Sequence, residues 1–230
     1  MPARIPSRSA DLRHHFVQGA TWLQESDHGT NTAALSYAAF EFRLTIERLA
    51  LHYWRQLLER RPEREDFRDI RSFKRIEQRI YALGGHQREI NGHFEFMRIV
   101  TNMLEIKGDL TTPDLGQLAN HWHSCSELCH ISWTLSCGVP QMQVAALESL
   151  KSVEKFITEQ IGGLASWPII HDPAFADLRD RYVAGKITPG DIEAYLKTVG
   201  LWTRIEYKDG RPSEFVGKAI APNEKPNSER

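Results

Sequence analysis

The segment 121–130, His-Trp-His-Ser-Cys-Ser-Glu-Leu-Cys-His, concentrates residue types that bind transition metals. Imidazole and thiolate groups are the usual zinc ligands, and four of them must converge on one ion. The surrounding pattern predicts a helix that carries Cys125 and Cys129 on its apolar face. His123 and His130 then project from roughly the opposite side, so these ligands cannot meet. We therefore expect buried thiols that behave as small apolar side chains, and neither a metal site nor a cofactor.

A second polar group lies on the longest predicted helix, residues 32–61. At 100° per residue, Glu41, Arg48 and His52 fall on one border of its apolar stripe. A carboxylate, a guanidinium and an imidazole on one strip are candidate binding residues that face a cleft or a partner subunit. The alternative is that they are ordinary border charges of a solvated helix.

The middle of the chain is mildly basic. Residues 43–98 contain 13 Lys and Arg against 9 Asp and Glu, although the whole chain has a net charge of −1. The cations are Arg55, Arg60, Arg61, Arg64, Arg68, Arg71, Lys74, Arg75 and Arg79, interleaved with acidic residues. This interleaving is typical of a solvated helix face with i,i+4 ion pairs, and the alternative is a surface for an RNA backbone or a partner protein.

Composition bounds the class of protein. A chain of 230 residues with 41% hydrophobic and 26% charged residues is typical of a globular protein. The three cysteines crowd into one predicted helix, which favours a reducing compartment. The N-terminus lacks an apolar signal core and no run of 18 apolar residues occurs, so we predict a cytoplasmic protein without a membrane segment. No glycine-rich phosphate loop or Gly-x-Ser-x-Gly elbow is present.

Hydrophobic periodicity near 3.6 residues predicts a mainly α fold, an antiparallel long-helix bundle. The predicted helices are 9–26, 32–61 ended by Pro62, a third that ends at Gly84-Gly85, a fourth stopped at Gly108, a fifth over 112–138, and a sixth that ends at 162–163. Proline, glycine and capping residues supply these boundaries.

The character of the chain changes after Leu164. Two short helices opened by 172–173 and 188–189, and a β-hairpin around Asp209-Gly210 with strands 202–207 and 214–216, predict a small C-terminal α+β module. The expected domains are the helical bundle 1–163, the module 164–221 and a disordered tail 222–230. The order of helices and hairpin in the module resembles a winged helix, a DNA-binding motif. Its second helix, 190–197, would be the recognition helix, but it is net acidic, which disfavours contact with DNA phosphates.

The segment 39–50, Ala-Phe-Glu-Phe-Arg-Leu-Thr-Ile-Glu-Arg-Leu-Ala, in a long helix of such a bundle resembles the HEPN superfamily over roughly residues 30–135. Members have a helical-bundle core, and many are dimeric, metal-independent ribonucleases used as toxins or in antiviral defence. The resemblance implies an Arg followed by a His after four to six residues, near the start of a late core helix. A cation then offsets phosphorane charge while an imidazole moves protons to and from ribose and leaving oxygens.

Two pairs match this motif as the resemblance implies it. Arg88 and His93 have four residues between them and open the fourth predicted helix, and Arg79 and His86, with six between them, are the alternative pair. Gly92 inside the first pair is a poor helix former, which either weakens the match or marks a close backbone approach. The opposing interpretation is a surface arginine and a histidine at a helix edge.

Three functions remain open from the sequence. The leading hypothesis is a HEPN-like, self-associating protein of a bacterial toxin–antitoxin or antiviral defence system, with RNA as substrate and a metal-independent ribonuclease activity. The second is a non-catalytic helical scaffold or regulatory subunit that binds a partner protein or antitoxin. The third is a nucleic-acid-binding regulator that acts through the C-terminal module.

Overall fold

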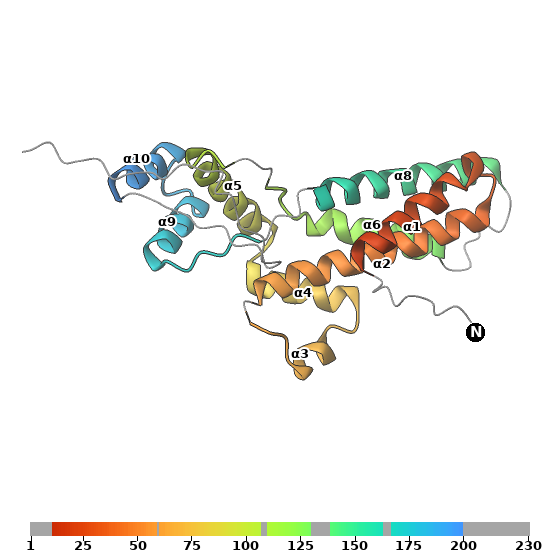
Figure 1. Ribbon diagram of the computed structural model, residues 1–230, viewed down its shortest axis with the longest axis horizontal. Helices are drawn as coiled ribbons and strands as arrows, with labels where there is room; N and C mark the ends of the chain where they lie inside the picture. Colours follow the sequence, from red (N-terminus) through yellow and green to blue (C-terminus); the bar gives the residue numbers. More distant parts are fainter. Residues whose placement is uncertain (1–10, 59, 107–109, 130–138, 163–166, 200–230) are drawn as a thin grey trace, which may run out of the picture. The chain divides into compact units, whose positions relative to one another are not determined.

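The computed structural model describes residues 11–58, 60–106, 110–129, 139–162 and 167–199. The described part is mainly helical, as predicted (Figure 1). Two compact units divide the chain: Met1–Gln87 with Pro113–Gly162, and Arg88–Thr112 with Gly163–Arg230. The predicted hairpin, 202–207 and 214–216, and the tail 222–230 lie outside the described residues.

The first unit is built around α2, Thr32–Leu57, which runs antiparallel to α1, Leu12–Gln24. Asp11 caps α1 by accepting a hydrogen bond from His14 N, and Asn31 caps α2 in the same way. A short 3-10 turn, η1 (Asp27–Gly29), joins the two helices.

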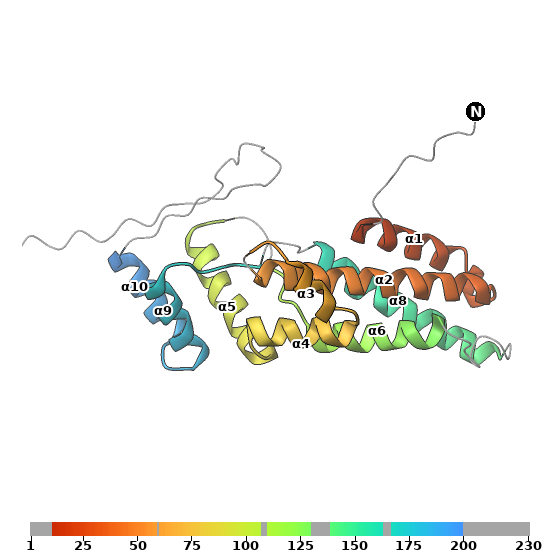
Figure 2. The ribbon, with the colours of Figure 1, turned by 90° about the horizontal axis from the view of Figure 1, so that it is seen from below.

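Three further helices pack against α2, as the second view shows (Figure 2). They are α4 (Phe73–Gly84), α6 (Leu115–Cys129) and α8 (Pro140–Gly162). The apolar face of α2 is completely buried, because Leu35, Ala38, Ala39, Phe42, Ile46 and Leu49 are each 0% exposed. The predicted stripe of this helix is therefore the centre of the core.

The segment after α2 differs from its prediction in two ways. The structure ends α2 at Leu57 rather than near residue 61, since Pro62 disfavours helix for the residues before it. The predicted third helix is two helices, α3 (Arg64–Asp69) and α4, separated at 70–72. Ser72 causes this break, because its extended backbone lets its side chain accept a hydrogen bond from Arg75 N.

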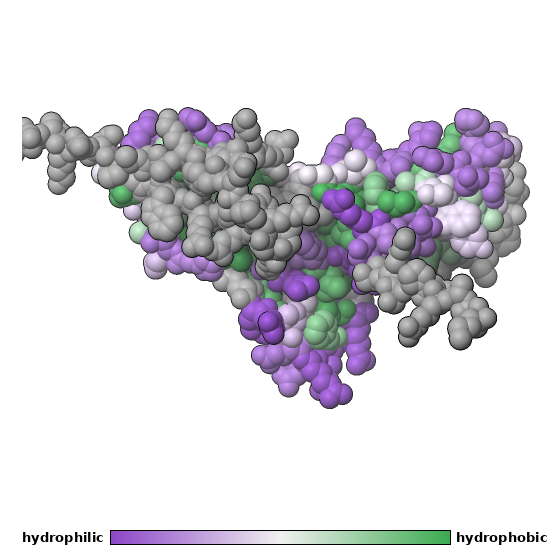
Figure 3. All heavy atoms as spheres, viewed as in Figure 1, coloured by the Kyte–Doolittle hydropathy of each residue, from purple (hydrophilic) through white to green (hydrophobic). Residues whose placement is uncertain are grey.

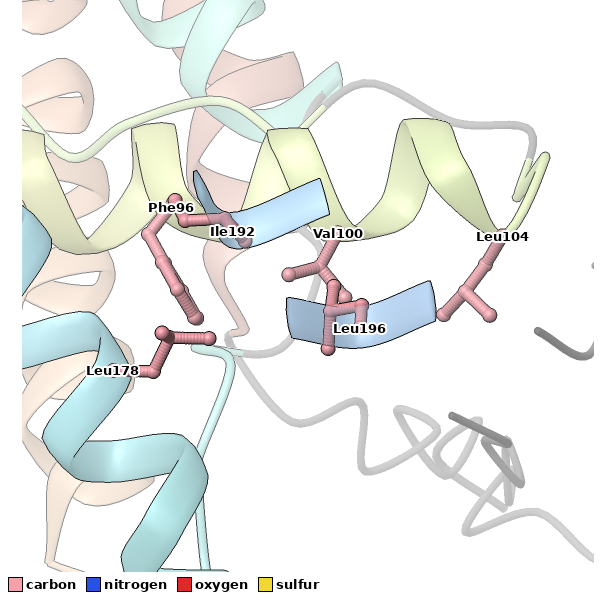
Figure 4. Close-up of a cluster of buried hydrophobic side chains, with 6 residues drawn as sticks. All are labelled: Phe96, Val100, Leu104, Leu178, Ile192 and Leu196. Atoms are coloured by element: carbon pink, nitrogen blue, oxygen red, sulfur yellow. The ribbon is translucent and has the colours of Figure 1, made fainter. Parts of the chain in front are cut away.

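The second unit contains α5 (Gln87–Met103), whose first residue is counted with the first unit, together with α9 (Pro173–Val183) and α10 (Pro189–Val199). The two short helices begin where the sequence predicted them. Figure 4 shows their core, in which side chains of α5 point toward those of α9 and α10. The buried members are Phe96, Val100, Leu104, Leu178, Ile192 and Leu196.

This core moves the expected domain boundary. The sequence placed the fourth helix inside a bundle 1–163, whereas the structure groups Arg88–Thr112 with the C-terminal residues. The reason is the apolar face that α5 presents: Phe96 and Val100, which the sequence analysis did not single out, pack on Leu178, Ile192 and Leu196. Sequence periodicity reveals that a helix is amphipathic but does not reveal which neighbour covers it.

The contact between α1 and α2 predicts a sharp steric effect at Gly19. A Cβ atom on this residue would lie 2.6 Å from the ring of the fully buried Phe42. Gly19→Ala should therefore lower the free energy of unfolding by about 1–3 kcal/mol, because the ring cannot retreat in a packed core. Thermal or urea denaturation followed by circular dichroism measures the change.

Gly116→Ala is the matched control, because its Cβ would meet only Asp114 Oδ1, at 3.5 Å. Alanine is the better helix former, so this variant should be as stable as the wild type or up to about 1 kcal/mol more stable. Equal stability of the wild type and Gly19→Ala would contradict the close packing of α1 on α2.

Candidate functional site

His93, the histidine of the first predicted pair, lies inside the second unit. Its side chain is buried, and Nε2 donates a hydrogen bond to the carbonyl oxygen of Pro168 at 2.7 Å. Its ring stacks on Trp167 and meets Phe94 edge-on. Burial lowers the pKa of His93 below its usual value, opposed by the bond to Pro168. These contacts hold the imidazole in place and favour its neutral form, so His93 stabilises the fold of the second unit.

Arg88, its predicted partner, is exposed. Five residues along a helix turn the side-chain direction by about 140°, so Arg88 and His93 leave α5 on different sides. Gly92 marks a close approach, since a Cβ there would lie 3.0 Å from a methyl group of Val183 on α9. The structure thus gives Gly92 a packing role and does not bring this Arg and His into a common environment.

The alternative pair lies at the end of α4 in the first unit. Arg79 is exposed, and His86 is exposed just beyond Gly85, where the chain turns with φ 82°. The His86 ring lies 5.9 Å from the ring of Tyr81. Both side chains of this pair are exposed, in contrast to that of His93.

The predicted binding strip on α2 does not form one site. Glu41 Oε2 lies 2.7 Å from Nδ1 of the buried His15 on α1, so this carboxylate ties the two helices together. Arg48 is exposed, and His52 is half-buried beside Tyr53. The partnership with His15 could not be seen in the sequence, because the two residues are 26 positions apart.

Cys125 is buried, as predicted, whereas Cys129 is half-buried. Burial raises the pKa of both thiols, to about 11 for Cys129, so at neutral pH they are protonated and unreactive. Burial also lowers the pKa of His121, whose ring packs against Phe156 at 4.8 Å. Within the described residues no three His, Cys, Asp or Glu side chains gather where they could hold a metal ion. His130 and Cys137 lie outside the described residues.

A polar network on α6 and α2 takes the place of the metal site that the ligand types suggested. Trp122 Nε1 donates to Glu47 Oε1 at 2.8 Å, and Arg43 Nε donates to the same oxygen at 3.2 Å. The guanidinium lies over the Trp122 ring at 4.9 Å, and Phe73 of α4 stacks on that ring at 5.2 Å. This network links three helices and is a structural feature rather than a reactive one.

An arginine pocket, formed where α3 meets α4, is the candidate functional site of the first unit. It has a volume of about 460 Å³, and its described lining residues are Arg68, Arg71, Ser72, Arg75, Gln78 and Arg79. Hydrophilic side chains crowd the surface over α3 (Figure 3). Four guanidinium groups and no carboxylate among these residues make the pocket strongly positive.

The break between α3 and α4 creates this arrangement. Ser72 begins α4 at the pocket, so the positive end of the helix dipole adds to the side-chain charge. Asp66 of α3 is held by Arg60 through two hydrogen bonds of 2.7 and 2.9 Å. Those bonds, and the charge of Arg79, lower the pKa of Asp66. Arg60, which does not line the pocket, is thus the hydrogen-bond partner of this carboxylate, and Arg68, Arg71 and Arg75 contribute their positive charge to the pocket.

None of the described helices is both long enough and apolar enough to cross a membrane.

The buried His93 predicts a pH dependence of stability. Because the folded protein holds the pKa of His93 below the usual 6.5, the unfolded chain binds more protons just below that pH. The stability contributed by the neutral ring is complete above pH 6.5 and is lost as the pH falls. The temperature at the midpoint of thermal unfolding should therefore decrease as the pH is lowered from about 7.5 to about 5.5.

His93→Gln should show a smaller fall, since a glutamine amide still donates to the Pro168 carbonyl but does not titrate. His86→Gln, at an exposed histidine, should follow the wild-type curve. Identical pH profiles of wild type and His93→Gln would show that folding does not lower the pKa of His93.

Comparison with protein-family models, with curated proteins and with solved structures finds no match for this chain. The HEPN resemblance therefore stays a prediction.

Proposed function

We propose that this chain is a HEPN-like RNA-binding protein of a toxin or antiviral defence system, and that its arginine pocket binds RNA phosphates. One observation carries the proposal: four arginines converge on a pocket of about 460 Å³ at the start of α4. The planar guanidinium group matches phosphate oxygens through two parallel hydrogen bonds. Backbone phosphates supply most of the affinity of proteins for nucleic acid.

Local charge supports this proposal where whole-chain charge does not. The net charge of −1 gives no general attraction to RNA. The pocket concentrates four arginines within one short segment, 68–79, and Asp66, just before this segment, is ion-paired with Arg60. A compact cationic pocket on a nearly neutral protein favours the binding of one defined anionic group over non-specific binding of RNA across the protein surface.

Cleavage, the activity that the resemblance implies, is assigned in this proposal to Arg79 and His86. Arg79 lines the pocket, and the exposed His86 follows the same helix by a short turn. In such a reaction the imidazole removes the proton of a ribose 2′-hydroxyl, and the 2′-oxygen attacks phosphorus. The bond to the 5′-oxygen breaks to leave a 2′,3′-cyclic phosphate, and the imidazolium returns the proton to the leaving 5′-oxygen. The guanidinium offsets the charge that develops on the phosphoryl oxygens. Arg88 and His93 are the weaker pair because His93 is buried and hydrogen-bonded to Pro168.

A second candidate function, a scaffold that binds a protein, has its own supporting observation. The outer face of α1 and α2 exposes large apolar side chains, with Val17 56%, Tyr37 53% and Phe40 48% exposed. The rings of Trp22 on α1 and Tyr37 on α2 lie 5.0 Å apart and are tilted by 42°. Exposed aromatic side chains that lie together are typical of surfaces that bind another protein, such as an antitoxin or a second copy of the chain.

RNA binding is tested by titrating a labelled single-stranded RNA at several salt concentrations. Arg71→Ala and Arg75→Ala should each weaken binding about three- to tenfold and make the dependence on salt less steep. Arg13→Ala, which removes an exposed arginine from α1, is the charge-matched control and should bind as the wild type does. Binding that is equal in all four proteins would exclude the pocket.

Cleavage is tested in the presence of EDTA, which removes free divalent metal. Arg79→Ala and His86→Ala should each reduce the rate at least a hundredfold, because each group acts in the transition state. Arg88→Ala should leave the rate unchanged. Full activity in His86→Ala, together with complete loss in Arg88→Ala, would place the catalytic site on α5. If the wild-type protein does not cleave RNA, it binds RNA without catalysis.

A further inference from the structure

The arginine pocket has more positive charge than one link of an RNA backbone requires. Arg68, Arg71 and Arg75 alone bring three cations to its described lining, and Asp66 nearby is paired with Arg60. An internal phosphodiester carries one negative charge, whereas a terminal phosphate carries about −1.5 to −2 at neutral pH. Each further phosphoryl group of a chain adds one more. A diphosphate or triphosphate therefore matches the charge of the pocket far better than a phosphodiester does.

The chemistry of the pocket wall points in the same direction. Its described residues are arginine, serine and glutamine, without an aromatic or apolar side chain. Proteins that hold nucleobases stack them on aromatic rings, and ligand pockets that hold a whole small molecule are mostly apolar. The guanidinium, hydroxyl and amide groups of this wall can all donate to phosphate oxygens, and no ring is present on which a base could stack. The ligand group that it recognises is therefore the phosphate chain and not the base.

The geometry of the helices explains why a compact anion fits. Arg75 and Gln78 are three residues apart on the first turns of α4, and Arg71 comes just before Ser72, the residue that caps this helix. Arg68 approaches from α3, and Ser72 brings the N-terminus of α4, a helix of 12 residues, to the pocket. The described lining therefore comes from α3, from α4 and from the residues between them, within one short segment of the chain. A site that follows a strand over many nucleotides is a longer groove.

We propose that the arginine pocket binds a terminal di- or triphosphate, carried by the 5′ end of an RNA or by a free nucleotide. In the form carried by RNA, the inference rests on the proposed function and specifies the part of the RNA that the pocket selects. The ligand chemistry is the same for both sources.

The test compares three RNAs of one sequence that carry a 5′-hydroxyl, a 5′-monophosphate or a 5′-triphosphate. The triphosphate RNA should bind at least tenfold more tightly than the hydroxyl RNA, with the monophosphate between them, because charge-assisted bonds to arginine add with each phosphoryl group. Inorganic tripolyphosphate should displace the labelled triphosphate RNA. ATP and GTP, titrated alone, identify whether a free nucleotide is also bound.

Two variants link the preference to the pocket. The double variant Arg71→Ala/Arg75→Ala should bind all three RNAs with the affinity of the hydroxyl form. Arg75→Lys keeps the charge but loses the planar guanidinium group, so it should retain only part of the preference for triphosphate RNA. Because this substitution is conservative, a partial loss in this variant is not a result of misfolding. Arg13→Ala should keep the full preference, and circular dichroism establishes that each variant is folded.

The outcomes separate this inference from the proposed function. Equal affinity for the three 5′ ends, still lost in the double variant, overturns the inference and leaves RNA binding intact. Binding of tripolyphosphate and ATP without any binding of RNA supports the inference with a free nucleotide as the source, and it overturns the proposed function. If neither tripolyphosphate nor triphosphate RNA binds, the pocket is not a phosphate site.

Discussion

Burial of α2 is the constraint on which the first unit depends. Its apolar face is inaccessible to solvent, and α1, α4, α6 and α8 all pack against it. The polar side chains at the edge of this face must find partners, because an unpaired buried polar group costs free energy. Glu41 pairs with His15, Glu47 with Arg43 and Trp122, and Tyr53 OH donates to Gln160. No buried side-chain nitrogen or oxygen in the described part lacks a partner.

The same requirement explains why candidate catalytic residues on the buried helices are structural. His93 is the clearest example, since its imidazole is fixed by a carbonyl and two aromatic rings. His121 and Cys125 lie against apolar neighbours, where burial shifts the pKa of each toward its uncharged form. The exposed charged groups that can contact a ligand, such as the arginines of α3 and α4, lie on the outer helices, where water solvates them.

The outer helix pair α3 and α4 holds little of the core and most of the local charge. Phe73, Ile76 and Ile80 anchor α4 to the bundle, which leaves its other side to Arg75, Gln78 and Arg79. Because α3 is only six residues long, the chain turns between the two helices and brings Arg68 close to the arginines of α4. One uninterrupted helix would distribute the same cations along a rod and form no pocket.

The sequence by itself determined most of the described helices, because an apolar period of 3.6 residues and the capping residues act locally, although it did not separate α3 from α4. It predicted the buried stripe of α2, the starts of α9 and α10, and the inert thiols of α6. Only the tertiary structure decided which helix covers which. The grouping of α5 with α9 and α10, the His15–Glu41 pair and the arginine pocket all depend on contacts between residues far apart in sequence or across a turn. Local pattern cannot encode such contacts, since an amphipathic face specifies burial but not its partner.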